Sequence, residues 1–208
     1  GIASMKNVQL GIFDGTITTN GSYSTADPKK PAVDFDLNIQ TASFGKTFAS
    51  LEMVQKLVPI FENVKGTYSM KMSLKTLLDD KMNIDYNSLL SNGLLQSNKV
   101  QVGNVLVLSS LAKALKNDNL KSFSTKDLKI PFTIAEKCVN VKPFDVKVAN
   151  YTLNLGGKTG LDKSILYDGK LTLPPGTPSP FGLNITTIPF NILGTFSNPK
   201  LENRTAEL

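Results

Sequence analysis

The chain has 208 residues, 23 Lys and Arg against 17 Asp and Glu, and a formal net charge of +6 at pH 7. Its hydrophobic content of 40% and charged content of 19% are typical of a chain that folds around a core. There is no histidine, which excludes Ser-His-Asp and Cys-His catalysis and His-ligated metal sites, and the single cysteine, Cys138, excludes an internal disulfide.

The positive charge does not by itself indicate a nucleic-acid partner. Arg204 is the only arginine, whereas base readout and bidentate phosphate binding favour arginine. The lysines are scattered along the chain without a dense basic run. We therefore expect a solvated, lysine-rich surface and no nucleic-acid partner; a dedicated anionic partner is the alternative interpretation. No apolar run reaches the ~18 residues of a membrane-spanning helix.

The first third of the chain predicts three strands. Met5–Phe13 and Thr16–Tyr23 are strand-like and are joined at Asp14-Gly15, a strong hairpin signal. Residues 33–40 then alternate strictly between apolar and polar side chains, which indicates a half-buried strand.

The periodicity changes from strand to helix at Ser43. Apolar residues recur at helical spacing as far as Val58, which predicts one amphipathic helix of about four turns. Ser43 or Thr41 is the expected N-cap, and Pro59 is expected to bend or end the helix. Cationic residues do not dominate its polar face, so packing against a sheet is favoured over lying on a membrane surface.

The middle of the chain repeats the pattern of strand, helix and strand. Strands are predicted from Gly66 and over Gly93–Val102, with a turn at residues 79–81. A second amphipathic helix follows from about Asn104, the expected N-cap, to Lys116. Three apolar positions of the two helices lie 64 residues apart, which indicates a pseudo-repeat of residues 32–80 and 93–150. These pairs are Phe44 and Leu108, Phe48 and Ala112, and Leu51 and Leu115.

The remainder is almost entirely strand. Alternating or strand-like runs cover residues 128–134, 139–148, 153–159, 165–173, 183–188 and 190–196. Pro131 indicates an edge or a bulge, and Pro143 indicates a bulge because the alternation shifts by one residue there. We expect an extended loop at Pro174–Pro180 and a flexible tail at residues 201–208.

One stretch imitates a nucleotide-binding motif. Residues 156–160 read GGKTG, like the end of a phosphate-binding loop, but Thr152 stands where that loop requires a glycine. The preceding residues alternate as a strand and no helix follows. We interpret the stretch as a glycine-rich turn or bulge between paired strands.

Catalytic and metal sites have little support in the sequence. Asp34 and Asp36 share one face of a strand at about 7 Å, a separation that suits an inverting glycosidase pair or part of a cation site. The same alternation makes them the solvent face of the strand. Without a histidine base, a metal cluster or a phosphate loop, we expect no enzyme, no cofactor and no metal.

Apolar strand faces are the remaining candidate for function. Two modest helices are available to cover many strands, so part of a long curved sheet can stay open as a lipid- or partner-binding groove. The alternative is that both helices fill the groove and make it the core. The candidate groove residues are Phe35, Leu37, Ile39, Met70, Met72, Phe132 and Phe144.

Several motifs, in order, resemble the C-terminal domain of the AsmA family, periplasmic proteins of Gram-negative envelopes related to TamB. They cover most of residues 66–200. The matching pieces are Gly66–Met72; Leu89, Gly93, Leu95 and Gln96; Leu111, Ala112, Ala114 and Leu115; Lys142–Lys147; Leu155–Gly157 and Thr159–Asp162; and Gly194–Lys200.

This resemblance implies a periplasmic module, held by an inner-membrane anchor outside these residues, that acts in outer-membrane biogenesis. The wider superfamily resembles bridge-type lipid carriers, which implies phospholipid or another envelope lipid, or other envelope proteins, as partners. The family has no catalytic residues to transfer. We thus predict an α+β, mainly β fold: one elongated domain over residues 1–200, with a long curved antiparallel sheet and two amphipathic helices against its concave face. The alternative function is a protein-interaction scaffold with a filled core and no ligand.

Overall fold

A computed structural model describes residues 1–114, 116–177 and 185–204. Eleven strands form one antiparallel sheet in which spatial order follows chain order, so each strand pairs with its sequence neighbours. The strands are β1 (Ile2–Ile12), β2 (Gly15–Ser24), β3 (Ala32–Ser43), β4 (Val64–Leu77), β5 (Leu90–Val102), β6 (Phe123–Ala135), β7 (Cys138–Val148), β8 (Tyr151–Gly160), β9 (Ser164–Thr172), β10 (Thr187–Thr195) and β11 (Asn198–Asn203).

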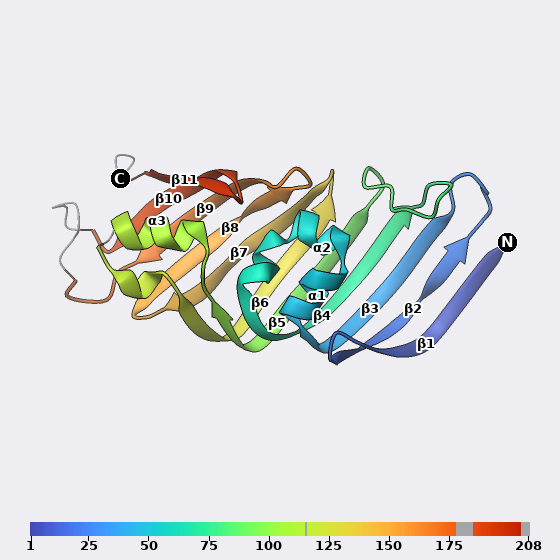
Figure 1. Ribbon diagram of the computed structural model, residues 1–208, viewed down its shortest axis with the longest axis horizontal. Coiled ribbons are helices and arrows are strands. Elements are labelled where there is room, and N and C mark those ends of the chain that lie inside the picture. The colour runs from blue at the N-terminus through green and yellow to red at the C-terminus, as the bar shows by residue number, and fades with distance from the viewer. Residues whose placement is uncertain (115, 178–184, 205–208) are drawn as a thin grey trace.

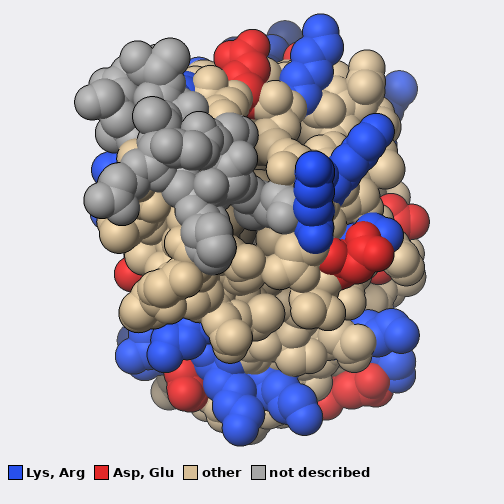
Figure 2. Space-filling model, turned by 90° about the vertical axis from the view of Figure 1, so that its left-hand side faces the viewer, with Lys and Arg blue, Asp and Glu red and all other residues tan. Residues whose placement is uncertain are grey.

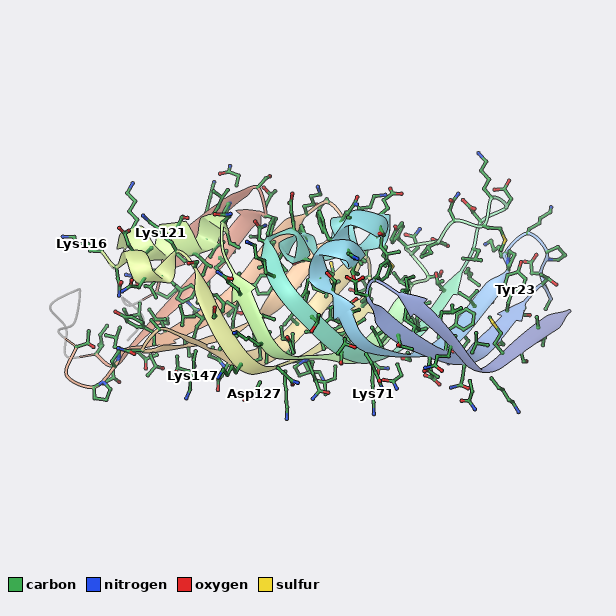
Figure 3. The ribbon with its side chains drawn as sticks, turned by 60° about the horizontal axis from the view of Figure 1, so that its bottom comes forward. Tyr23, Lys71, Lys116, Lys121, Asp127 and Lys147 are labelled. Carbon is green, nitrogen blue, oxygen red and sulfur yellow. The ribbon has the colours of Figure 1, made fainter. Side chains whose placement is uncertain are left out.

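All helical segments lie on one face of this sheet. They are α1 (Phe44–Ser50), α2 (Glu52–Leu57), α3 (Leu106–Ala114) and two short 3-10 helices, η1 (Pro59–Asn63) and η2 (Asp118–Leu120). The sheet is open and curves around them (Figures 1 and 3). We call the face that carries the helices the concave face and the opposite one the convex face. The predicted mainly β fold with an open curved sheet is confirmed.

Strict alternation gives the two faces opposite polarity. Pairing places Leu37, Met72 and Phe132 in one row across β3, β4 and β6, with Gly93 of β5 between the last two. The neighbouring row carries polar residues, such as Asp36 opposite Ser73. Because successive side chains of a strand point to opposite faces, the apolar rows share the concave face and the polar rows share the convex face.

The first hairpin forms where the sequence predicts it, but its turn lies one residue earlier. Ile12 pairs with Gly15, so the two turn residues are Phe13 and Asp14. Both have left-handed backbone angles, φ 54° and 63°. Two consecutive left-handed residues match the twist of a two-residue hairpin. Asp14 also forms an ion pair with Lys46 of α1.

The single four-turn helix predicted from Ser43 is wrong, because the chain breaks at Leu51. Ser43 is the N-cap, as expected, and its Oγ accepts a hydrogen bond from the Lys46 backbone N. Leu51 is extended (φ −117°, ψ 108°) and separates α1 from α2. The Gln55 side chain donates a 2.9 Å hydrogen bond to the Phe48 carbonyl. This bond satisfies a carbonyl in the last turn of α1, where no further turn of the helix supplies a donor. The break lets Leu57 enter a different core cluster from Phe44.

The second helix is confirmed as α3, with two differences. Asn104 lies two residues before the helix and is left-handed (φ 57°), so it lacks the extended conformation of an N-cap. Leu115, predicted on the apolar stripe, lies outside the described residues. None of the described helices is both long enough and apolar enough to cross a bilayer.

The two helical insertions cover different parts of the sheet. α1 and η1 pack over β3–β6, in a core that includes Phe44, Phe61 and Leu95. α3 arises between β5 and β6, yet its Leu111 and Ala112 pack with residues of β7–β10 such as Val146 (Figure 1). α3 therefore crosses from the central strands to the C-terminal half of the sheet.

The ladder between β6 and β7 is short. Only the four pairs from Phe132↔Val141 to Ala135↔Cys138 join these strands. Pro131 lies next to the point where pairing stops, and it has no N–H to donate. The bulge predicted at Pro143 is confirmed, because the register of β7 against β8 shifts between Val141 and Phe144. α3 spans the sheet on both sides of this weak seam.

Two other expectations need correction. The predicted turn at GGKTG is wrong, because these residues end the continuous strand β8 and the turn follows them at Leu161-Asp162. The alternative prediction, a bulge between paired strands, is confirmed, since the β7–β8 register shifts directly opposite Gly156. Residues 201–203, predicted as tail, belong to β11. Residues 178–180 of the predicted loop and 205–208 of the predicted tail lie outside the described residues.

Candidate apolar groove

The structure brings six of the seven candidate groove residues together, on β3, β4 and β6. Ile39 pairs with Met70 and Leu37 with Met72, while Phe35 lies one row further along β3. Phe144 on β7 lies beyond the seam, among the residues packed under α3. All seven side chains are on the concave face, as alternation within each strand requires.

The centre of this face is closed. Ile39 is only 6% exposed and packs with Met70 and Phe132 against α1 and η1. Phe44, Phe61 and Tyr68 form an aromatic cluster there, with ring centroids 4.8–5.6 Å apart. For these residues the filled-core interpretation holds.

A buried hydroxyl pair ties α1 to the sheet. The Thr47 hydroxyl donates to the Ser43 carbonyl at 2.7 Å, so the Tyr68 hydroxyl is the donor in the 2.9 Å bond between Tyr68 and Thr47. Burial raises the pKa of Tyr68 above its usual value, which keeps the phenol neutral. The centre of the groove is therefore anchored core and not a binding surface.

Glycines on the concave face are covered by aromatic rings from the neighbouring strand. A Cβ at Gly93 would lie 2.6 Å from the Phe132 ring, and a Cβ at Gly21 would lie 2.3 Å from that of Phe35. Each aromatic residue pairs directly with its glycine. Gly169 has the same relation to Phe190. The missing Cβ lets the ring lie flat on the strand, an arrangement that permits tight curvature.

The N-terminal end of the concave face is open. Leu10 of β1 is 55% exposed, and Met5 and Ile12 are each 36% exposed. Register places Leu10 opposite Ile17 and Met5 opposite Gly21, in the rows that continue to Ile39 and Phe35. None of the described helices overlies β1 and β2 (Figure 1). We call these three residues, with Phe35 and Leu37, the open groove.

Two polar groups border the open groove. Thr19 pairs with Leu37 and is 9% exposed, and its Oγ1 has no hydrogen-bond partner in the described part of the chain. The Tyr23 hydroxyl lies 3.5 Å from the Met82 sulfur, so the β4–β5 loop reaches this end of the groove. The groove is thus mostly apolar, with two hydroxyls along β2.

The other candidate sites do not assemble. Asp34 and Asp36 are exposed on the convex face, and Asp34 forms a 3.0 Å ion pair with Lys75 on the next strand. Asp79 organises its turn by accepting hydrogen bonds from Asn83 and Lys81, and these lower its pKa. Within the described residues there is no group of three potential metal ligands. Two shallow depressions, of about 490 and 440 Å³, lie at strand ends away from the groove residues.

Sequence reasoning missed the contribution of β1. Val8 and Leu10 alternate with Gln9 and Gly11, so the signal for an amphipathic strand was present. A bulge between Met5 and Val8 places Met5 on the same face of the sheet as Val8 and Leu10. Strict alternation would put Met5 on the opposite face, so the sequence pattern alone cannot reveal this. Comparisons of the chain with protein-family models, with curated proteins and with solved structures give no match.

Proposed function

We propose that this chain is a non-enzymatic module of a bacterial cell envelope that holds the acyl part of a lipid against its open groove. One observation carries the proposal: the apolar concave face continues past the helices onto β1 and β2, where half-exposed Leu10 and the partly exposed Met5 and Ile12 remain. Apolar side chains gathered on one concave surface are the chemistry that an acyl chain requires.

The resemblance to the AsmA family supplies the proposed setting. In this proposal the module is periplasmic, belongs to a protein anchored in the inner membrane, and serves outer-membrane biogenesis. The closed centre limits the lipid-binding part to β1–β3, so this chain alone holds a lipid and does not form a complete conduit. A phospholipid is the proposed ligand, because envelope membranes consist largely of such lipids.

The proposal is tested by native mass spectrometry and lipid extraction after gentle purification. We expect bound phospholipid on the unmodified chain and a loss of most of it in Leu10→Ser. Leu166→Ser is the matched control, because the Leu166 side chain of β9 is 43% exposed on the convex face, where it pairs with Lys158. A lipid-free protein, or equal loss in both variants, would contradict lipid binding by the groove.

A second candidate is a protein-interaction scaffold, and the geometry of β1 favours it. β1 is an edge strand of 11 residues, whereas the opposite edge β11 has six and carries Pro199. A long edge strand without proline accepts an extended segment of another protein more readily than a short edge that carries proline. In a pull-down from envelope extracts, the scaffold hypothesis predicts that the unmodified chain captures a partner protein. This partner should be lost when prolines replace Ser4 and Gln9 but should be retained by Leu10→Ser.

A further inference from the structure

The convex face concentrates lysines that are far apart in the sequence. Strands β4–β8 carry nine lysines and only two acidic residues, Asp127 and Asp145. The lysines are Lys65, Lys71, Lys75, Lys99, Lys126, Lys129, Lys142, Lys147 and Lys158. All nine are exposed, and alternation places them opposite the side chains that face the helices, as with Lys71 beside Met70 and Lys147 beside Val146. We call them the lysine face.

Register and orientation confirm that this is one surface. Lys71 and Lys147 point away from the helices, on the same side of the sheet as Asp127 (Figure 3). On the paired strands β4–β6, with strands about 4.8 Å apart and about 3.3 Å per residue, the six lysines cover roughly 10 by 33 Å, and the lysines of β7 and β8 extend this face beyond the seam. Basic side chains also line the lower rim of the molecule at its α3 end, where they outnumber the acidic side chains among them (Figure 2).

The charges on this face are poorly compensated. Lys99 and Lys126 are direct partners on β5 and β6, and like charges in that position destabilise a sheet. Within the described residues, the lysine face forms one ion pair, between Lys75 and Asp34 on its border. Asp145 accepts a hydrogen bond from the Asn154 amide at 2.7 Å and is not paired with a lysine. Such a face is electrostatically complementary to an anionic surface.

Apolar side chains lie among the lysines. Leu94 on β5 is 36% exposed, pairs with Lys71 and lies beside Pro131 of β6. Leu90, 53% exposed, pairs with Lys75. Exposed leucines paired with lysines suit a bilayer surface, where the ammonium groups meet lipid phosphates and the leucines enter the interface.

We propose that the lysine face docks this protein on the surface of a bilayer that contains anionic phospholipid. A duplex nucleic acid is itself convex and would meet this convex face along a narrow line, and bidentate phosphate contacts favour arginine, which strands β4–β8 lack. Single strands require exposed aromatic rings, but all the aromatic residues of β4–β8 pack on the concave side. This docking does not depend on whether the open groove holds a lipid.

Vesicle flotation tests the proposal with two kinds of vesicle, phosphatidylcholine alone and phosphatidylcholine with phosphatidylglycerol. We expect binding only to the anionic vesicles, weakened by high salt. The variant Lys71→Gln, Lys99→Gln, Lys126→Gln, Lys129→Gln should bind at least ~10-fold more weakly, because each lysine near an anionic surface contributes severalfold.

The control removes four exposed lysines elsewhere: Lys29→Gln, Lys30→Gln, Lys81→Gln, Lys116→Gln. It has the same net charge as the test variant and should bind within about threefold of the unmodified protein, because its sites lie off the lysine face. Circular dichroism verifies that both fold. Equal loss in both variants, equal binding to neutral vesicles, or tighter binding to duplex DNA or an acidic peptide than to anionic vesicles would overturn the proposal. Leu10→Ser should dock normally, which separates docking from lipid binding in the groove.

Discussion

At the scale of single residues, the glycines under aromatic rings determine how closely neighbouring strands approach. At Gly93 the space for a side chain is already taken by the Phe132 ring, by the Lys71 carbonyl at 2.9 Å and by Met72 Cβ at 2.9 Å. Two of these three neighbours are not flexible side-chain ends, so the site cannot easily relax. The requirement for glycine here is steric, because Gly93 is not among the residues with positive φ.

We expect Gly93→Ala to lower the free energy of unfolding by about 1–3 kcal/mol, the usual cost of overpacking. Gly45→Ala is the control, because a Cβ there meets nothing within 4 Å and Gly45 lies inside α1, where alanine is the better helix former. Chemical denaturation measures both. Adding Phe132→Ala should recover part of the Gly93→Ala cost; fully additive effects would contradict steric coupling between the two residues.

Tyr68 gives the core a predictable response to alkaline pH. Burial raises its folded-state pKa above the unfolded value of about 10, so the unfolded chain releases its proton first as the pH rises. The contribution of the neutral Tyr68 phenol to the free energy of unfolding is complete below pH ~10, and it is lost as the pH rises through the folded-state pKa. Melting temperatures measured from neutral to strongly alkaline pH should therefore fall less steeply in Tyr68→Phe than in the unmodified protein.

Tyr68→Phe should also cost about 1 kcal/mol at neutral pH, since the bond to Thr47 is lost while the contacts with Phe44 and Phe61 remain. Tyr167 shares the alkaline response, because burial raises its pKa as well. A variant with both tyrosines replaced by phenylalanine should show the smallest alkaline loss. Parallel curves for the unmodified protein and Tyr68→Phe would show that the phenol does not titrate with unfolding.

At the scale of elements, α3 and the residues that follow it hold the C-terminal half of the sheet. Leu120 is fully buried in the core formed with β7–β10, whereas Leu106 at the start of α3 is 53% exposed. Leu120→Ala should destabilise the protein by about 2–5 kcal/mol, and Leu106→Ala by less than about 1 kcal/mol. Equal effects, measured by thermal or chemical unfolding, would contradict the packing of this segment on the sheet.

Much of each element could be predicted from the sequence, because alternation and helical spacing are local. The face assigned to residues 33–40, the cap at Ser43 and the bulge at Pro143 follow from a few neighbouring residues. The break at Leu51 does not follow from neighbouring residues, because it depends on Phe44 and Leu57 packing into separate core clusters. The pseudo-repeat of residues 32–80 and 93–150 stays a prediction.

Relations across strands could not be predicted without the register of the sheet. Gly93 and Phe132 are 39 positions apart in sequence, and only the pairing of β5 with β6 brings them together. The lysines are scattered in the sequence and gather because each occupies a convex position in its own strand. The candidate groove residues were therefore placed on the correct face, whereas their division into covered and open residues depended on where the helices pack.

At the scale of the whole molecule, the sheet divides at the seam between β6 and β7. Pairing with β7 stops beyond Phe132 and Val141, so the rest of β6, residues 123–131, pairs with β5 alone. In an antiparallel strand alternate amides point to opposite neighbours. Every second amide of residues 123–130 therefore lacks a strand partner on the β7 side, although α3 connects the two halves of the sheet.

We expect an alternating pattern of amide hydrogen exchange along residues 123–130, with slow exchange for amides bonded to β5 and faster exchange for those that point toward β7. β5 provides the internal reference, because it is paired on both sides along most of its length and should protect successive amides. Residue-resolved NMR exchange measures both strands in one sample. Uniform protection along β6 would show that the two halves form one continuous ladder, and that α3 is cover for the sheet without being needed to hold its halves together.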